Sequence, residues 1–304
     1  MPLVSVVMLS YNHEAFVSES IEGVLGQDFD DLELIIVDDA STDSSRQIIQ
    51  KYAAQDPRIR VLLHEANCGI AKTANDGIAA AKGKFVALNA SDDVWTKNKL
   101  TKQLAVAASN ENLIVWSEGE VIDPNGQSIG KSFSEFCRAV SRKKSGDIWQ
   151  ELLGLNYIFG STVLFKKRNL GDVRFDEGLI YLNDHKFYLE LARQYQFYYI
   201  AEPLAKYRTH SANALGGSSP ETLKRHQIAD KEYLLIVEDA MRQYDDEITR
   251  ETRAVIYGLM GSIYYSAGEK KKGLRFFLRA VKCNPFEKRN LQYPGLALKR
   301  MLAR

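Results

Sequence analysis

The sequence predicts an α/β protein with a doubly wound, mostly parallel sheet, followed by a region made only of helices. Short apolar runs alternate with segments of helical spacing through the first third of the chain. From about residue 220 onward, helical spacing continues without a further strand-like run. Because strands that alternate with helices pair in parallel through right-handed crossovers, the first pattern predicts a sheet covered by helices on both faces.

Length and composition are those of a globular protein. With 304 residues, of which 45% are hydrophobic and 26% charged, we expect a first domain over 1–215 and a helical domain over 216–304. The net charge of +1 gives no field that would attract nucleic acid. Three widely spaced cysteines indicate neither a disulfide framework nor a zinc site. Without a signal peptide or a run of roughly 18 apolar residues, we expect a cytoplasmic protein that meets a membrane only at its surface.

The elements follow in order along the chain. Apolar runs predict strands, and 3.6-residue spacing predicts helices. Strands are expected over 3–9, 32–37, 59–63, 85–88, 113–116, 157–165 and 197–200, and helices over 14–26, 43–54, 69–81, 96–108 and 148–155. The stretch 127–145 is polar and is expected to be a basic loop.

Two of the predicted strands end in adjacent acids, Asp38-Asp39 and Asp92-Asp93. In an open α/β sheet the ligand crevice lies beyond the carboxyl ends of the strands. Neighbouring carboxylates raise each other's pKa unless a cation offsets their charge, and Mg²⁺ or Mn²⁺ takes such oxygen ligands. Alternatively, each pair only caps the helix that follows it. The residues alone leave both interpretations open.

The turn after the first strand is Ser10-Tyr11-Asn12, without the glycines of a dinucleotide- or triphosphate-binding loop. Tyr11 could stack on a nucleobase, or it could simply be an interfacial aromatic. Asp39 could accept the ring N–H of uracil or thymine, or two N–H groups of guanine.

Several motifs occur in a fixed order and together resemble one family, the inverting glycosyltransferases of family 2, which have the GT-A nucleotide-sugar-binding fold. The resemblance covers roughly residues 3–210, is of the bacterial polysaccharide and O-antigen type, and rests on Val4–Val7 with Ser10–Asn12, Glu33–Asp43, Asn67–Gly69, Asn75–Ile78 and Ser91–Trp95. It implies a nucleotide-sugar donor, usually a UDP-sugar. Ser10, Tyr11, Asp39 and Asp92 would then contact the nucleotide, and Asp93 would hold Mn²⁺ or Mg²⁺.

The resemblance also implies roles for residues further along the chain. Asp184 matches the acid that acts as general base, which an inverting transfer needs because the acceptor hydroxyl loses its proton as it attacks. Alternatively, Asn183 and Asp184 only cap a helix. Arg208 and His210 match a closing segment that contacts the diphosphate or the metal, and the loop through Gly216–Ser219 could order over the donor.

This sequence departs from the family pattern at three points. Ala90 stands where an acid is usual, and Asn183 replaces the Glu beside the general base. Thr73-Ala74-Asn75 replaces Ala-Arg-Asn, so a cation near the base or diphosphate is missing, for which Lys72 is a candidate substitute. The first two departures favour an alternative function, a nucleotide-sugar-binding scaffold that has lost transfer.

The last third predicts a helical hairpin, with helices through residues 255–267 and 270–283. Its glycine, tyrosine and proline spacing resembles a single tetratricopeptide unit. From Lys270 to Arg304 there are eleven Lys or Arg residues against Glu287 alone. Such a basic end fits contact with anionic lipid, or else a solvated surface or a self-association face that makes a homo-oligomer.

The sequence therefore predicts a metal-dependent, inverting glycosyltransferase on the inner face of a membrane. It would move a sugar from a nucleotide-diphosphate donor, most simply a UDP-sugar, to a hydroxyl of a saccharide or lipid-linked acceptor in cell-surface polysaccharide biosynthesis. A thymidine or guanosine diphosphate sugar is the alternative donor.

Overall fold

The computed structural model describes residues 1–110, 112–211, 213 and 219–285, and these form two compact units. The first unit contains Met1–Ile148 and Tyr157–Thr222, and the second contains Trp149–Asn156 and the chain from Leu223 onward. The expected boundary between residues 215 and 216 falls among residues outside the described ranges. The assignment of Trp149–Asn156 to the second unit differs from the expected division, because these residues pack against distant helices.

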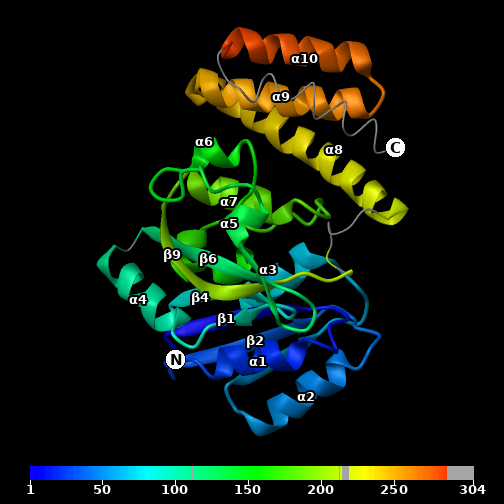
Figure 1. The fold of residues 1–304 in the computed structure, drawn as a ribbon. Helices are drawn as coiled ribbons and strands as arrows, with labels where there is room; N and C mark the ends of the chain where they lie inside the picture. Colours follow the sequence, from blue (N-terminus) through cyan, green and yellow to red (C-terminus); the bar gives the residue numbers. More distant parts are fainter. Residues whose placement is uncertain (111, 212, 214–218, 286–304) are drawn as a thin grey trace. The chain divides into compact units, whose positions relative to one another are not determined.

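The first unit is built on a nine-stranded mixed sheet in the order β3-β2-β1-β4-β8-β6-β9-β5, with β7 paired to β6 (Figure 1). The predicted parallel half is confirmed: β1, β2, β3 and β4 all pair in parallel. In the other half, β8 runs antiparallel to both neighbours and β6 pairs in parallel with β9. The strands are β1 (Val4–Ser10), β2 (Leu32–Asp38), β3 (Ile59–Leu63), β4 (Phe85–Ala90), β5 (Val94–Trp95), β6 (Leu113–Ile122), β7 (Ser128–Ser132), β8 (Leu164–Lys166) and β9 (Gln196–Arg208).

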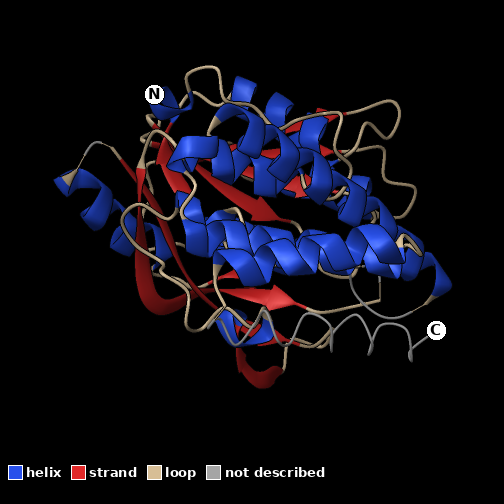
Figure 2. Cartoon of the chain, turned by 90° about the horizontal axis from the view of Figure 1, so that it is seen from above, coloured by secondary structure: helices blue, strands red, loops and turns tan. Residues whose placement is uncertain are grey.

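Helices cover both faces of this sheet, as the alternation predicts (Figure 2). On one face, Val4, Val6 and Met8 of β1 share a core with apolar residues of α1 (Val17–Leu25), α2 (Ser45–Gln55) and α4 (Lys99–Ser109). On the other face lie α3 (Ile70–Ala80) and α7 (Asn183–Ala192). Gly77 lets α3 approach closely, since a Cβ there would lie 2.3 Å from Cγ1 of Val7.

Several predicted elements differ from the structure. The expected strands over 113–116 and 197–200 extend to Ile122 and Arg208, because β6 and β9 pair along their whole length. The expected helix over 148–155 is limited to α6 (Trp149–Leu152). The expected strand over 157–165 is interrupted by η1 (Gly160–Thr162), and only β8 continues as a strand. The reason is local hydrogen bonding: Thr162 Oγ1 donates to the Phe159 carbonyl (2.7 Å), and Ser161 reaches across to Asp93. The polar stretch 127–145 is not all loop, because it contains β7 and α5 (Phe133–Phe136), whose first turn has a capping box of Ser132 and Glu135. The 3-10 turn η2 (Lys167–Leu170) follows β8.

The second unit consists of α6 (Trp149–Leu152), most of α8 (Pro220–Gln243), η3 (Asp245–Glu247), α9 (Arg250–Ser266) and α10 (Lys270–Cys283). The predicted hairpin is confirmed as α9 and α10, which lie side by side (Figure 1). They approach closely at Gly261, where a Cβ would lie 2.7 Å from Phe277. The Tyr233 hydroxyl of α8 donates to the Leu153 carbonyl (3.0 Å), which holds the segment after α6 in this unit. Among the described residues, no helix is both long enough and apolar enough to cross a bilayer.

Candidate active site

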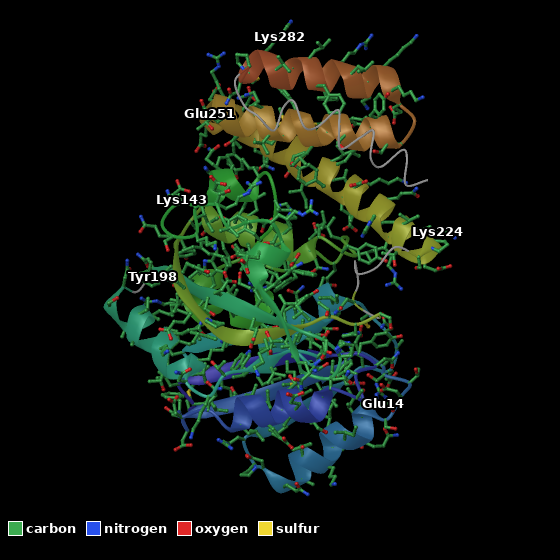
Figure 3. All side chains as sticks on the ribbon, viewed as in Figure 1. Glu14, Lys143, Tyr198, Lys224, Glu251 and Lys282 are labelled. Carbon is green, nitrogen blue, oxygen red and sulfur yellow. The ribbon has the colours of Figure 1, made fainter. Side chains whose placement is uncertain are left out.

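The turns after β1 and β2 are fastened to each other at the carboxyl edge of the sheet. The side-chain oxygen of Asn12 accepts the Thr42 N–H (2.8 Å), and the Asn12 N–H donates to Ser41 Oγ (2.9 Å). Glu14, labelled in Figure 3, accepts the Ser44 N–H at the start of α2 (2.8 Å). Tyr11 therefore stands on a braced turn with 44% of its surface exposed, as a stacking platform for a base requires.

The two acids at the end of β2 have separate surroundings. Asp38 is fully buried and accepts hydrogen bonds from Arg46 Nε (2.7 Å) and Ser41 Oγ (2.5 Å). Ser10, expected at the nucleotide, is also buried and donates to Asp38 (3.4 Å). Because α2 begins at Ser45 with Ser44 as its N-cap, neither acid caps that helix. Asp38 and Ser10 thus have structural contacts, and Asp39 is left for a ligand.

Asp39 is held by three donors. Its Oδ1 accepts from the Cys68 N–H and from His64 Nδ1, both at 2.8 Å, and its Oδ2 accepts from the Gly69 N–H, also at 2.8 Å. A carboxylate offers about four lone-pair sites, two on each oxygen. Among contacts of the described residues, one site on Oδ2 therefore remains open.

At the end of β4, Asp92 meets two histidines from other turns. The Nε2 atom of His210 lies 3.0 Å from Asp92 Oδ2, and that of His13 lies 3.8 Å from the same oxygen. One ligand atom from each of the three side chains lies within 4.8 Å of the others. Burial disfavours the charge on Asp92, but the hydrogen bond from His210 and the charges of both histidines outweigh it and lower its pKa. An ionised carboxylate between two imidazoles is a donor set that fits a divalent cation such as Mn²⁺.

Asp93 faces the protein interior instead. Its Oδ2 accepts from Ser161 Oγ (2.5 Å) and its Oδ1 from the Arg208 N–H (3.1 Å). Burial and the neighbouring charge of Asp92 raise the pKa of Asp93 well above its ordinary value. Because both oxygens of Asp93 are engaged by protein donors and Asp92 lies between two imidazoles, this geometry favours Asp92 over the predicted Asp93 as a metal ligand. Neither acid caps α4, which begins at Lys99 with Asn98 as its N-cap.

Arg208 is buried, with 1% of its surface exposed. Its guanidinium donates to Glu19 Oε2 (2.5 Å) and to the carbonyls of Asp92 (2.9 Å) and Pro124 (3.2 Å). It also packs over the Phe16 ring, 5.0 Å from the centroid. These contacts differ from the expected diphosphate contact: the side chain joins α1, the end of β4 and the turn after β6, and so holds Asp92 in position.

Asp184 lies in the first turn of α7 and is partly exposed. Its Oδ1 accepts the His185 N–H (2.6 Å), whereas the N-cap is Leu182 and the Asn183 amide donates to the Ile180 carbonyl (3.1 Å). Burial, with a smaller contribution from the charge of Asp184, raises the pKa of Tyr188 one turn further on. A Cβ on Gly160 would lie 3.4 Å from the Tyr188 hydroxyl, so α7 runs beside the segment that carries Ser161.

Two further expectations concern Lys72 and the loop over the donor. Lys72 pairs with both oxygens of Asp76 (2.5 and 2.7 Å) one helical turn away, so its charge is engaged within α3. The loop expected over the donor includes residues 216–218, which lie outside the described ranges. The His210 N–H at its start donates to the Asn213 side chain (2.6 Å).

Comparisons with known proteins agree with this architecture. The model of glycosyl transferase family 2 matches residues 5–169. An uncharacterized glycosyltransferase of Methanocaldococcus jannaschii is 32% identical over 211 residues, which is 68% of this chain and 71% of the relative. The chain belongs to glycosyl transferase family 2.

Other family members match over shorter stretches. TuaG of Bacillus subtilis, whose name refers to teichuronic acid biosynthesis, is 46% identical over 103 residues, covering 34% of this chain and 41% of TuaG. WfgD of Escherichia coli, named as a UDP-Glc:alpha-D-GlcNAc-diphosphoundecaprenol beta-1,3-glucosyltransferase, is 36% identical over 129 residues, covering 42% of this chain and 50% of WfgD.

Solved structures share the GT-A fold with this family 2 member. TarS of Staphylococcus aureus, crystallised with UDP, superposes with a TM-score of 0.59 at 16% identity, covering 100% of this chain and 92% of that one. The mannosyltransferase PcManGT of Pyrobaculum calidifontis, solved with GDP-Man and Mn²⁺, gives 0.55 at 16% identity, covering 94% and 88%. The predicted GT-A fold and the C-terminal helices are confirmed.

Two residues at this edge of the sheet, His13 and His64, contact Asp92 and Asp39 but were not singled out from the sequence. Both follow parallel strands directly, His13 after the turn that ends β1 and His64 after β3. Their position after strands was the available signal. The strands β3, β2, β1 and β4 are neighbours in the sheet, and residues that follow parallel strands meet at the same crevice.

We expect Arg208→Met to destabilise the protein without ligand. The change leaves the carbonyls of Asp92 and Pro124 without their donor, and each buried polar group left unsatisfied costs about 1–3 kcal/mol. Urea unfolding in the presence of a chelator measures this. Glu19→Gln is the control with a small expected effect, because the glutamine oxygen can still accept from Arg208 and the Glu19 side chain is 53% exposed. Unchanged stability together with weakened UDP binding would instead indicate that Arg208 contacts the diphosphate.

Proposed function

We propose that this protein is a metal-dependent inverting glycosyltransferase that uses a UDP-sugar and a saccharide or lipid-linked acceptor. One observation carries the proposal: at one edge of the sheet, a carboxylate with a single open acceptor site follows β2, and a cluster of side chains able to hold a metal follows β1, β4 and β9. Asp39 would receive the base, and His13, Asp92 and His210 would hold the cation.

The hydrogen-bond pattern of Asp39 favours uracil. Uracil presents one N–H at its ring edge, whereas guanine presents two donors that require an acceptor on each carboxylate oxygen. With both sites of Oδ1 in use, Asp39 can accept one further hydrogen bond, on Oδ2. The UDP complex of TarS and the name of WfgD support this reading, while the GDP-Man complex of PcManGT represents the alternative nucleotide.

In the proposed reaction, Asp92 at the end of β4 and His210 after β9, with His13, would hold the cation. When bound, Mn²⁺ or Mg²⁺ would supply positive charge to offset the charge of the leaving diphosphate. Arg208 keeps the Asp92 segment in position, and Tyr11 covers the base. Asp184 accepts the proton of the acceptor hydroxyl as that oxygen attacks the anomeric carbon from the side opposite the diphosphate, which inverts the configuration.

A lipid-linked acceptor is proposed from the names of two relatives and from the exposed apolar and basic side chains of α10. WfgD is named for a diphosphoundecaprenol-linked acceptor, and TuaG for biosynthesis of a cell-wall polymer. On α10, Leu274, Leu278 and Val281 recur at helical spacing and are 53%, 64% and 41% exposed. They lie beside basic residues of the same helix, Lys271, Arg275 and Lys282. Such a stripe suits the surface of an anionic membrane on which a lipid-linked acceptor is presented. The basic tail beyond Pro285 lies outside the described residues.

We expect UDP to bind at least about tenfold more tightly in Mn²⁺ than in a chelator, and Asp92→Asn to remove most of that difference. Isothermal titration calorimetry measures both. Asp93→Asn is the matched control, since an amide can accept from the Arg208 N–H and donate to Ser161 Oγ, and should keep the metal dependence. If Asp93→Asn abolishes the dependence and Asp92→Asn does not, the metal ligand is Asp93.

We expect Asp184→Asn to leave UDP affinity unchanged and to lower transfer by roughly 10²–10⁴-fold, the usual contribution of a general base. The test is UDP release from UDP-glucose with a diphosphoundecaprenol-linked saccharide. Glu177→Gln, an acid-to-amide change at another exposed position, is the control. Equal rates for Asp184→Asn and the unmodified protein would remove Asp184 from the mechanism, and absence of transfer by the unmodified protein with every UDP-sugar would favour the scaffold alternative.

We expect the double variant Leu274→Gln/Leu278→Gln to bind phosphatidylglycerol vesicles at least about tenfold more weakly, because burial of each leucine contributes about 1.5–3 kcal/mol. Co-sedimentation at low salt measures this. Leu235→Gln on α8 is the matched control, since Leu235 is 62% exposed. If the unmodified protein forms a dimer that the double variant disrupts, and does not bind vesicles, the stripe is a self-association face.

A further inference from the structure

His64 lies between two carboxylates. Its Nδ1 atom is 2.8 Å from Asp39 Oδ1, and its Nε2 atom is 3.1 Å from Asp76 Oδ2. The backbone on which the ring stands is fixed on both sides, because the His64 N–H donates to the Asp38 carbonyl (2.9 Å) and its own carbonyl accepts from Arg46. The ring is therefore held in one orientation against the carboxylate proposed to receive the base.

Each nitrogen of this ring faces a carboxylate. An ionised carboxylate only accepts hydrogen bonds, so Nδ1 of His64 is the donor in the contact with Asp39. Lys72 pairs with Asp76 on its other side, which completes a chain of contacts through Lys72, Asp76, His64 and Asp39.

The position of His64 also decides how Asp39 can receive a base. With the Cys68 N–H, the ring fills both lone-pair sites of Oδ1, and the Gly69 N–H takes one site of Oδ2. Removing the ring would free a site on Oδ1, so that each oxygen would have one. That is the arrangement that the two donors of guanine require.

We propose that His64 is a positioning residue that determines nucleobase specificity: by occupying Oδ1 of Asp39 it admits the single N–H of uracil and excludes the paired donors of guanine. The proposal rests on the proposed function, in which Asp39 receives the base. A purely structural role for His64 would affect both nucleotides alike. A specificity role changes their ratio.

The test compares the Kd values of UDP and GDP in Mn²⁺ by calorimetry. The unmodified protein should prefer UDP, and His64→Ala should reduce the UDP-over-GDP preference by at least about tenfold, because GDP gains a charge-assisted hydrogen bond. His64→Asn should restore the preference, since its amide can donate to Oδ1 from nearly the same place. Cys68→Ser is the control, because the backbone N–H that contacts Asp39 is retained.

The outcomes distinguish the role of His64 from the proposed recognition of the base by Asp39. If the unmodified protein does not prefer UDP, the proposed base recognition fails. If it prefers UDP and His64→Ala keeps that preference, the role of His64 is overturned and the proposed function stands. A loss of the UDP-over-GDP preference in Cys68→Ser would also overturn the role of His64. It would indicate that Asp39, His64 and Cys68 act together as cation ligands. Should His64→Ala not fold, ¹⁵N NMR of the ring in the unmodified protein decides, and an unprotonated Nδ1 overturns the proposal.

Discussion

Two adjacent buried carboxylates at the end of β4 are the constraint on which the rest of the site depends. Asp92 and Asp93 are neighbours in the chain and both are nearly inaccessible, so their charges cannot coexist without separate compensation. In the fold, the two carboxylate side chains point in different directions and have different partners. Asp93 turns inward to Ser161 and the backbone of Arg208, and Asp92 turns to the imidazoles of His13 and His210.

The same division recurs at the end of β2, which lies on the other side of β1 from β4. Asp38 turns inward to Arg46 and Ser41, whereas Asp39 turns to the backbone of Cys68 and Gly69 and to the His64 ring. In both pairs one acid braces the strand end and the other is presented at the crevice. At the end of β2 the extended backbone points successive side chains to opposite sides. At the end of β4 a turn, closed by the hydrogen bond from the Asp93 N–H to the Ala90 carbonyl (3.1 Å), gives Asp92 and Asp93 their different directions.

The groups that compensate these acids come from distant parts of the chain. Arg208 reaches Glu19, 189 positions earlier, and His210 reaches Asp92, 118 positions earlier. The turn at Asn12 is fastened to Ser41 and Thr42. Such contacts fix the site before a ligand arrives, which reduces the ordering that binding would otherwise require. The η1 segment interrupts its strand for the same reason, since Ser161 must leave the ladder to meet Asp93.

Sequence alone determined the elements whose formation depends on local spacing. The strand 59–63 and the helix 270–283 agree residue for residue with β3 and α10, and the acids at strand ends were recognisable because a change from apolar to acidic residues marks the edge of a sheet. The tertiary structure alone decided the direction of each acid in the two pairs, the burial of Arg208, and the contacts of His13 with Asp92 and of His64 with Asp39. Apart from the bonds of Asp38 to Ser41 and Arg46, these contacts join residues 25 to 189 positions apart, and side-chain periodicity carries no information about such partners.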